Sequence, residues 1–508
     1  MPNSSFGEAV LEVSVEVDLG RDIGQRFGSL FEIRDRQGRV VAGAGFADVY
    51  NTRYRVGRDT LQFFVRPKND DGRFTLERLP RPTDECGVYL FDLDGKVYAW
   101  GSGRERVIGS WDESARRWEG GHSDKMRSGD GKMRVGEGIL EFDERGARYN
   151  DRMILSPAKE GIYHHFYYAN GHLIFFQDQS SHEPKFGKLY ACPWTADSGQ
   201  PVDLAQAAVT PLTYPRETPF AFGQLGPTVL TCSNNGGVYA FDGRAWRTLR
   251  PANNQVSYQI YSMVNYYDRL LMAHYPSGVL YEFDGQDIKP LDGWPPVLAG
   301  VSRSAREAQT TMIYRGDLFV GVWPWAELWR RDRDEDRWIS MGRLFTHPPL
   351  TDKVQHPYEQ EVRELNAAQG ANIVINQWGQ RVASMIPLAD ALILSTSAKW
   401  PCAREPRLTC LTDAVYEEYG QVIRLRMPGN LAATIQPKAG PTRLTFAVAT
   451  DGMAIQQDGK LLATTRLDAK LTADIQPASI TWAHGVFGPL QGKLVSKSVR
   501  PACGADAP

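Results

Sequence analysis

Residues 257–291 read SYQIYSMVNYYDRLLMAHYPSGVLYEFDGQDIKPL, and this stretch decides the expected fold. It contains four short apolar runs, which are Gln259–Tyr266, Leu270–Tyr275, Val279–Phe283 and Ile288–Leu291. The breaks between them carry Asp-Arg, Pro-Ser-Gly and Asp-Gly, which favour tight turns because Pro and Gly pre-set or permit the turn dihedrals. The stretch therefore predicts a four-stranded antiparallel meander, which cannot bury both of its faces without neighbours.

The same unit recurs along the chain. Clear copies occupy 161–195, 220–249 and 310–344, and weaker copies occupy 87–118, 133–155 and 381–425. Four-stranded units at a spacing of roughly 40–50 residues are typical of propeller blades around a central channel. Together with the first stretch there are seven copies, so the sequence predicts an all-β protein built on a seven-bladed β-propeller.

The chain divides by pattern into three parts. Residues 1–80 contain alternating runs such as LEVSVEV and form an N-terminal β segment that docks on the propeller or closes its ring. Within this part, 69–81 reads as a linker. Residues 81–430 hold the blades. Residues 431–508 form a C-terminal β segment that resembles half of a small sandwich, either a carbohydrate-binding module or a structural cap.

The charge and hydropathy of the chain limit the kinds of partner that we expect it to bind. The 58 Lys and Arg residues balance 60 Asp and Glu to a net charge of −2, and the two signs are interleaved, so no nucleic-acid partner is expected. No apolar run is long enough to span a bilayer, so no membrane partner is expected. The N-terminus MPNSSFGEAV lacks the pattern of a signal peptide, which predicts a cytoplasmic protein, or a secreted or periplasmic one if the sequence begins at the mature end.

Two long connections, 345–377 and 398–419, carry residues that bind zinc in other proteins. These residues are His347, His356, Cys402 and Cys410. Their spacing fits no standard zinc motif, so they predict a structural clamp and not a catalytic centre. The alternatives are a bridge between the two cysteines, or plain reduced thiols, since six cysteines without a CxxC pair do not form a disulfide scaffold in 508 residues.

Candidate site residues follow from the expected arrangement of the blades. In a propeller, the loops before the innermost strands and after the second strands open on one concave face, where ligands bind. Alignment at the first turn places His172, Arg269 and Asp317 in register. It gives His164, Tyr261 and Gln309 one shared position, and Asp178, Tyr275 and Trp323 another. The predicted rim comprises His164 or His165, His182, Tyr258, Tyr261, His274, Tyr275, Trp323 and Trp325. Aromatic faces beside titratable side chains are typical of a sugar site.

Each candidate also has a structural interpretation. His164 and His165 are neighbours on a strand and should point to opposite faces, so at most one faces a ligand, and His164 is preferred because it shares the position of Tyr261. Tyr261 could instead pack between blades, and His274 could be satisfied within its turn. His182 could be a solvated loop residue. No GxSxG, HExxH or P-loop motif is present.

Three segments of the chain resemble the seven-bladed propeller polysaccharide lyases. They are QIYSMVNYYDRLLMAHYPSGVLYEFDG, AQTTMIYRGDLFVGVWPWAELWRRD and FGSLFEIRDRQGRVVAGAGF. The similarity is strongest to the ulvan lyases, with the rhamnose–glucuronate lyases as relatives. It implies β-elimination at a uronic acid of an acidic polysaccharide, without a cofactor for the chemistry, and it favours the structural zinc.

The resemblance also implies residue roles. A base removes the C5 proton, an acid protonates the leaving O4, and a further group neutralises the carboxylate. His164 and Tyr261 would be the acid–base pair, and His182 would assist. His274 and Tyr275 stand where these lyases commonly carry a neutralising arginine, so Arg216, Arg303 or Arg306 would substitute. Together, the predicted rim and these arginines give as candidate binding residues His165, Tyr258, Tyr275, Arg216, Arg303, Arg306, Trp323 and Trp325, and the rim gives His274 as a further catalytic candidate.

The leading hypothesis is therefore a lyase that acts on an ulvan-like glycan containing rhamnose and glucuronate. A second hypothesis is a propeller without catalytic activity that binds glycan or protein on the same face. A third is a glycoside hydrolase, which needs a pair of acids across a pocket, and no such pair is predicted on the rim.

Overall fold

The stretch that predicts a meander forms one in the structure. Strands β23 (Gln259–Tyr266), β24 (Arg269–Tyr275), β25 (Leu280–Phe283) and β26 (Ile288–Pro290) pair antiparallel in this order. The expected bounds agree with the observed ones to within one residue, because the turn residues end each strand locally.

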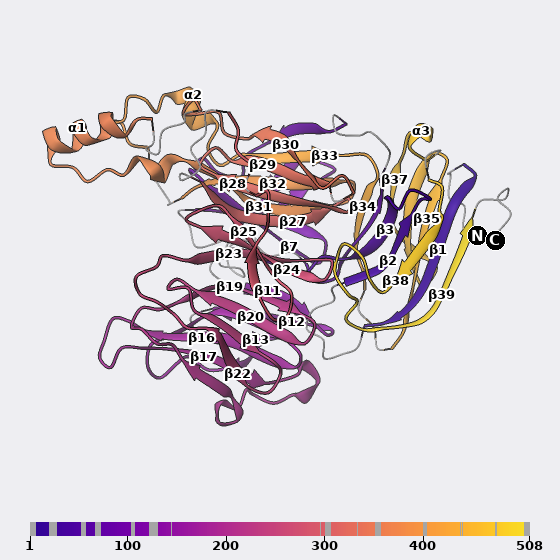
Figure 1. The fold of residues 1–508 in the computed structure, drawn as a ribbon, viewed down its shortest axis with the longest axis horizontal. Coiled ribbons are helices and arrows are strands. Elements are labelled where there is room, and N and C mark those ends of the chain that lie inside the picture. Colours follow the sequence, from indigo (N-terminus) through magenta and orange to yellow (C-terminus); the bar gives the residue numbers. More distant parts are fainter. Residues whose placement is uncertain are drawn as a thin grey trace.

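A computed structural model of the chain describes residues 7–19, 28–51, 57–66, 73–102, 107–120, 131–143, 145–294, 296–299, 306–332, 334–350, 357–399, 404–436, 438, 440–472 and 475–501. Within these residues, seven antiparallel sheets have the strand order of propeller blades (Figure 1).

The sheets follow one another in the chain. The first contains β7 (Val88–Leu93), β8 (Lys96–Gly101), β9 (Val107–Asp112) and β10 (Arg117–Glu119). The second contains β11 (Gly131–Val135), β12 (Gly138–Asp143), β13 (Gly146–Tyr149) and β14 (Arg152–Leu155). The third contains β15 (Ile162–Ala169), β16 (His172–Gln179), β17 (Phe186–Pro193) and β18 (Ala208–Pro211). The fourth contains β19 (Pro219–Leu225), β20 (Thr228–Ser233), β21 (Val238–Phe241) and β22 (Trp246–Arg250).

The fifth sheet is the meander of β23 to β26. The sixth contains β27 (Glu307–Tyr314), β28 (Asp317–Trp323), β29 (Glu327–Asp332) and β30 (Arg337–Arg343). The seventh contains β31 (Gln380–Leu388), β32 (Ala391–Ala398), β33 (Val422–Arg426) and β6 (Thr75–Leu79). Each sheet contacts the next, through the innermost strands of both except between the second and third sheets, where β12 contacts β15. β31 of the last sheet contacts β7 of the first, so the ring is closed. The predicted β-propeller is confirmed.

The outermost strand of the seventh sheet comes from the other end of the propeller sequence. β6 precedes the first sheet in the chain, yet it pairs with β33 from Thr75–Arg426 to Leu79–Val422. The interpretation of this segment as a linker is wrong, because its backbone hydrogen bonds join the first part of the propeller to the last.

The two ends of the chain together form a β-sandwich. One sheet has the order β37 (Lys460–Arg466), β36 (Gly452–Gln457), β35 (Thr442–Ala449), β1 (Ala9–Asp18) and β39 (Lys493–Pro501). The other has the order β34 (Asn430–Thr434), β5 (Thr60–Val65), β3 (Val40–Phe46), β2 (Gly28–Arg34) and β38 (Ser479–Trp482). Phe446 of the first sheet lies 5.3 Å from both Phe31 and Phe63 of the second, in the shared core. The sandwich lies on one side of the ring, and the N and C ends meet there (Figure 1).

Strand β4 (Val49–Asn51), which follows β3, lies inside the ring and pairs with the inner edge of β23. The Tyr50 ring lies 5.9 Å from those of both Tyr167 and Phe222, and the Asn51 amide donates to the Gln309 carbonyl at 2.7 Å. This segment therefore ties the sandwich to the innermost strands of four sheets.

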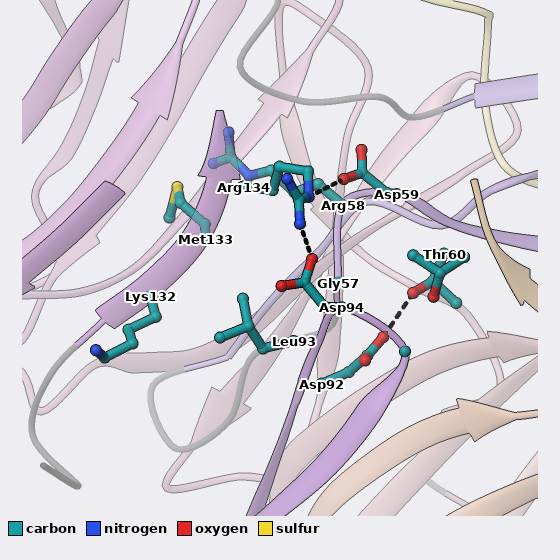
Figure 2. A pocket seen from close by; sticks show the side chains of 12 residues that line it. Gly57, Arg58, Asp59, Thr60, Asp92, Leu93, Asp94, Lys132, Met133 and Arg134 are labelled. Atoms are coloured by element: carbon teal, nitrogen blue, oxygen red, sulfur yellow. Dashed lines mark hydrogen bonds and ion pairs between the residues drawn. The ribbon is translucent and has the colours of Figure 1, made fainter. Parts of the chain in front are cut away.

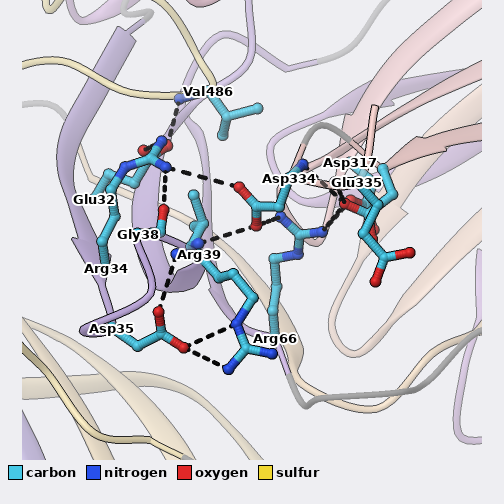
Figure 3. Close-up of polar contacts among 12 residues, drawn as sticks. Glu32, Arg34, Asp35, Gly38, Arg39, Arg66, Asp317, Asp334, Glu335 and Val486 are labelled. Carbon is cyan, nitrogen blue, oxygen red and sulfur yellow. Dashed lines mark hydrogen bonds and ion pairs between the residues drawn. The ribbon is translucent and has the colours of Figure 1, made fainter. Parts of the chain in front are cut away.

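A buried ionic cluster also joins the sandwich to the sixth sheet (Figure 3). Arg66, which follows β5, lies 3.0 Å from Asp317 and 3.1 Å from each of Asp332 and Asp334. Arg330 adds a contact of 3.0 Å to Asp317. Burial lowers the pKa of Arg66, but the three carboxylates outweigh this effect and raise the pKa above its usual value. The cluster is charged and paired, which makes it sensitive to the loss of any one member.

Helices are short and few in the described part of the chain. They are α1 (Glu359–Gln369), α2 (Asp413–Glu417), α3 (Ala469–Thr472) and the 3₁₀ turns η1 (Ala196–Ser198), η2 (Leu204–Gln206) and η3 (Ile375–Trp378). α1 and α2 project from the side of the ring that faces away from the sandwich (Figure 1). Among the described helices, none has both the length and the apolar character that a membrane crossing requires.

Candidate functional site

The two faces of the ring differ in what covers them. The turns that follow the innermost strands β31 and β23 lie against the sandwich, where the Ala432 amide donates to the Ala389 carbonyl and the Tyr267 amide donates to the Val486 carbonyl. At the opposite edge the innermost strands begin and the second strands end, as shown by the pairs Gln259–Tyr275 and Glu307–Trp323. We call this edge of the ring the open face. It is the face on which the sequence predicts ligand binding.

Five successive innermost strands, β15, β19, β23, β27 and β31, carry a β-bulge close to the open face. In β23 the extra residue is Tyr261, and in β27 it is Gln309. The two residues thus share one position, as the alignment at the first turn predicted. A bulge turns its side chain out of the regular alternation of a strand, and bulges are common next to functional sites.

The bulge in β15 changes how the two neighbouring histidines lie. His165 has φ +53°, and the rings of His164 and His165 are 4.5 Å apart. The expectation that they point to opposite faces is wrong, because it assumed a regular strand. A positive φ at a residue with a side chain is strained, and such positions cluster at functional sites.

His164 has the properties of a proton acceptor at neutral pH. Burial lowers its pKa to about 4, although Asp178 acts in the opposite direction. Within the described part of the chain its Nε2 atom is buried and has no hydrogen-bond partner. The ring is therefore neutral at pH 7, and none of the described residues forms a hydrogen bond with its Nε2 atom.

A line of aromatic rings runs from the histidine pair to Tyr275. Phe220 lies 6.2 Å from His165 and 5.5 Å from Tyr261, and Tyr261 lies 6.2 Å from Tyr275. The Tyr261 hydroxyl donates to Gln259 Oε1. The structure therefore brings together five of the predicted residues on the open face, with Phe220 among them. Four are His164, His165, Tyr261 and Tyr275. The fifth is Trp323, which contacts the same lysine, Lys399, as Tyr275 does.

Lys399 is the residue at this face that the sequence did not reveal. Its Nζ atom lies 4.7 Å from the centre of the Tyr275 ring, 5.2 Å from that of Trp323 and 2.7 Å from Glu307 Oε1. It follows Ala398, which pairs with Gln380 as Tyr275 pairs with Gln259. Alignment of the weak seventh copy with the clear ones would have placed Lys399 beside the ends of the other second strands.

Two predicted site residues lie in the core between the fourth and fifth sheets. His274 is 5% exposed and Tyr258 is 7% exposed, and their rings are 4.3 Å apart. His274 Nδ1 lies 2.8 Å from Ser277 Oγ, and the Arg250 guanidinium lies over the Tyr258 ring. The structure does not bring them into contact with the histidine pair.

Acidification should destabilise the protein in part through His274. Burial, with a smaller effect of Arg250, lowers its pKa to about 4 from the usual 6.5. The unfolded chain therefore binds more protons between pH 6.5 and 4, so stability rises with pH across this window and is lost as the pH falls. We expect wild type to lose roughly 2 kcal/mol through this group between pH 7 and pH 5, and His274→Gln to be spared that loss.

Urea unfolding at the two pH values measures this difference. His484→Gln, at a partly exposed histidine beside Asp268, is the matched control and should keep the wild-type dependence. Identical losses in wild type and His274→Gln would refute the assignment.

The remaining predicted residues are placed as follows. Arg306 is fully buried and paired with Glu327 at 2.8 Å, and Trp325 is 2% exposed and donates from its indole nitrogen to the Pro348 carbonyl. These two side chains are therefore occupied by structural contacts. His182 and Arg216 are exposed in the loops that precede β17 and β19, and Arg303 lies outside the described residues.

The predicted zinc ligands are only partly described. His356 and Cys402 lie outside the described residues. His347 Nε2 is 3.9 Å from Glu418 Oε1, and Cys410 is a free thiol whose pKa is raised to about 11 by burial and by Glu361. No group of three or more His, Cys, Asp or Glu residues in the described ranges could hold a metal ion. The described residues therefore do not fit a zinc site.

A small pocket of about 20 Å³, partly open to solvent, lies where the sandwich meets the first two sheets (Figure 2). Arg134 pairs with Asp59 at 3.1 Å and with Asp94, and Thr60 donates to Asp92 at 2.6 Å. Burial raises the pKa of Asp92 to about 6. Because the Arg134–Asp59 and Thr60–Asp92 contacts cross the junction, we interpret the pocket as a joint between the two parts of the protein.

Comparison with known family models and with curated proteins finds no match. Several solved structures are similar in fold. The WD40 β-propeller domain of Doa1 is 10% identical, with 69% of this chain and 96% of that chain covered and a TM-score of 0.36. BamB from Moraxella catarrhalis is 10% identical, with 66% and 88% covered and a TM-score of 0.32. YCF48 from Cyanidioschyzon merolae is 9% identical, with 70% and 99% covered and a TM-score of 0.39. By the order of its own strands, this chain is a β-propeller with a β-sandwich made from both of its ends.

Proposed function

We propose that the protein is a polysaccharide lyase that cleaves a uronate-containing glycan, of the ulvan or rhamnose–glucuronate type, by β-elimination at the open face. The observation that supports this most is that a neutral His164, whose Nε2 has no hydrogen-bond partner among the described residues, and a tyrosine, Tyr261, both lie near the open face, on innermost strands that Phe220 separates. A neutral imidazole and a phenol are suited to accept and donate a proton without a cofactor.

In the proposed reaction His164 takes the proton from C5 of the uronate. The electrons of the C5–H bond form the C4–C5 double bond as the C4–O4 bond breaks. The Tyr261 hydroxyl gives its proton to the leaving O4 and is reprotonated from water after product release. Phe220 and Tyr275, on either side of Tyr261, offer apolar faces against which sugar rings can stack.

The test is ultraviolet absorbance during incubation of the purified protein with ulvan and with gum arabic. We expect absorbance to rise with one of them, because elimination creates a conjugated double bond that hydrolysis does not create. Reducing ends are measured in parallel. New ends without absorbance would indicate a glycoside hydrolase. Neither signal, together with binding to a uronate glycan, would indicate a propeller without catalytic activity.

A further inference from the structure

Lys399 is held in place by side chains from the two sheets that precede its own. Tyr275 comes from the fifth sheet, and Trp323 and Glu307 come from the sixth, while Lys399 itself follows β32 of the seventh. The lysine side chain is 23% exposed, whereas that of Glu307 is 4% exposed. Of the two partners in this ion pair, Lys399 is therefore the one that solvent, or a ligand on the open face, reaches more readily.

A second cation lies behind Lys399 without a carboxylate partner of its own. Arg381 is 1% exposed, and its hydrogen bonds within the described residues are all with neutral atoms. These contacts are Gln309 Oε1 at 3.0 Å, the Tyr89 hydroxyl at 3.1 Å, and the carbonyl oxygens of Ala398 at 3.2 Å and Lys399 at 3.0 Å. Gln309 in turn donates to Glu307.

The cluster as a whole therefore carries an excess of positive charge. Among the described residues, Lys399 is paired with the carboxylate of Glu307 while Arg381 is paired with none, so the formal sum of these three side chains is +1. Unbalanced charge in a buried setting is costly, and an anionic group beside the ammonium would balance it. The walls beside the ammonium are aromatic rings, which stack on the apolar faces of sugars.

We infer that Lys399, between Tyr275 and Trp323, is a subsite that binds the carboxylate of a uronate residue. The inference rests on the proposed function for the class of substrate. It assigns to Lys399 the neutralisation of the substrate carboxylate, a role that the buried Arg306 cannot fill. Tyr275 links Lys399 to Tyr261, with a 6.2 Å ring separation on one side and the 4.7 Å ammonium contact on the other. An ammonium at this place would stabilise the negative charge that grows on the carboxylate as C5 loses its proton.

The test compares binding of a glucuronate oligosaccharide with that of its carboxyl-reduced, neutral counterpart. Binding is measured by calorimetry with the His164→Ala variant, because this substitution prevents turnover of the sugar. We expect the acidic sugar to bind about 10–100-fold more tightly than the neutral one, as for hydrogen bonds to charged groups, and Lys399→Met to remove this preference. Lys399→Arg, which keeps the charge, should retain part of it. Lys185→Met, at a partly exposed lysine in the loop before β17, is the matched control and should retain all of it.

The outcomes separate this inference from the proposed function. If Lys399→Met keeps the preference while wild type produces the absorbance signal, the subsite is refuted and the lyase stands. If wild type shows no elimination but Lys399→Met abolishes the preference, the subsite stands and the lyase is refuted. If the His164→Ala protein binds neither sugar, or binds a sulfated neutral oligosaccharide as tightly as the uronate, the carboxylate subsite is refuted. A circular-dichroism melt of each variant shows that the fold is retained.

Discussion

His164→Ala and Tyr261→Phe should each lower kcat by about 10²–10⁴-fold, the usual contribution of a positioned acid or base. His164→Ala removes the nitrogen that accepts the C5 proton. Tyr261→Phe keeps the ring contacts with Phe220 and Tyr275 but removes the hydroxyl that protonates O4. Initial rates of absorbance increase on the glycan substrate measure both effects.

The double variant distinguishes catalysis from packing. Residues that act in one proton-transfer step are strongly non-additive, so the double variant should be little slower than the slower single variant. His484→Ala, beside the sandwich, and Tyr190→Phe, on β17, are the controls and should keep wild-type rates. Full activity in either site variant would remove that residue from the mechanism.

The pH dependence of kcat/KM provides a further check on His164. Because the pKa of His164 is lowered to about 4, the base stays unprotonated down to mildly acidic pH. We expect the acid limb of the profile to fall only near pH 4, with lower activity below it. A limb centred near 6.5, the usual value for histidine, would show that another histidine is the base.

Asp317→Asn should destabilise the protein by about 3–5 kcal/mol, because it leaves buried cations without their common carboxylate. Asp317 is fully buried and contacts Arg66 at 3.0 Å, Arg330 at 3.0 Å and Arg315 at 3.3 Å. Arg66→Met removes the cation from the sandwich side and should cost a similar amount, since it leaves three carboxylates close together (Figure 3).

Urea unfolding at pH 7 measures these losses. Arg39→Met is the matched control, because Arg39 also pairs with a carboxylate, Asp35, but its side chain is 40% exposed. Exposed pairs of this kind contribute about 0–1 kcal/mol. If the buried and exposed variants lost the same small amount, the cluster would not hold the sandwich to the ring.

The meander and the positions that its repeats share were predictable from local chemistry. Turn residues such as Pro276 and Gly278 end the strands, so the bounds of β23 to β26 follow from neighbours in the chain. Counting back from the turn placed Tyr261 and Gln309 at one position, and the pairing confirms it. The bulge at His165 was not predictable, because a single positive φ reverses the alternation on which the reading of a strand depends.

What the sequence by itself determined is the class of the fold, the repeat, and the placement of His164, Tyr261 and Tyr275 on one face. These follow from strand period and turn chemistry, which act over a few residues. Only the tertiary structure decided that β6 completes the last sheet, that β1 pairs with β39, and that Lys399 lies against Tyr275 and Trp323. Such contacts join residues that are far apart in the chain, and they form because closing the ring buries the edges and faces that each sheet leaves open.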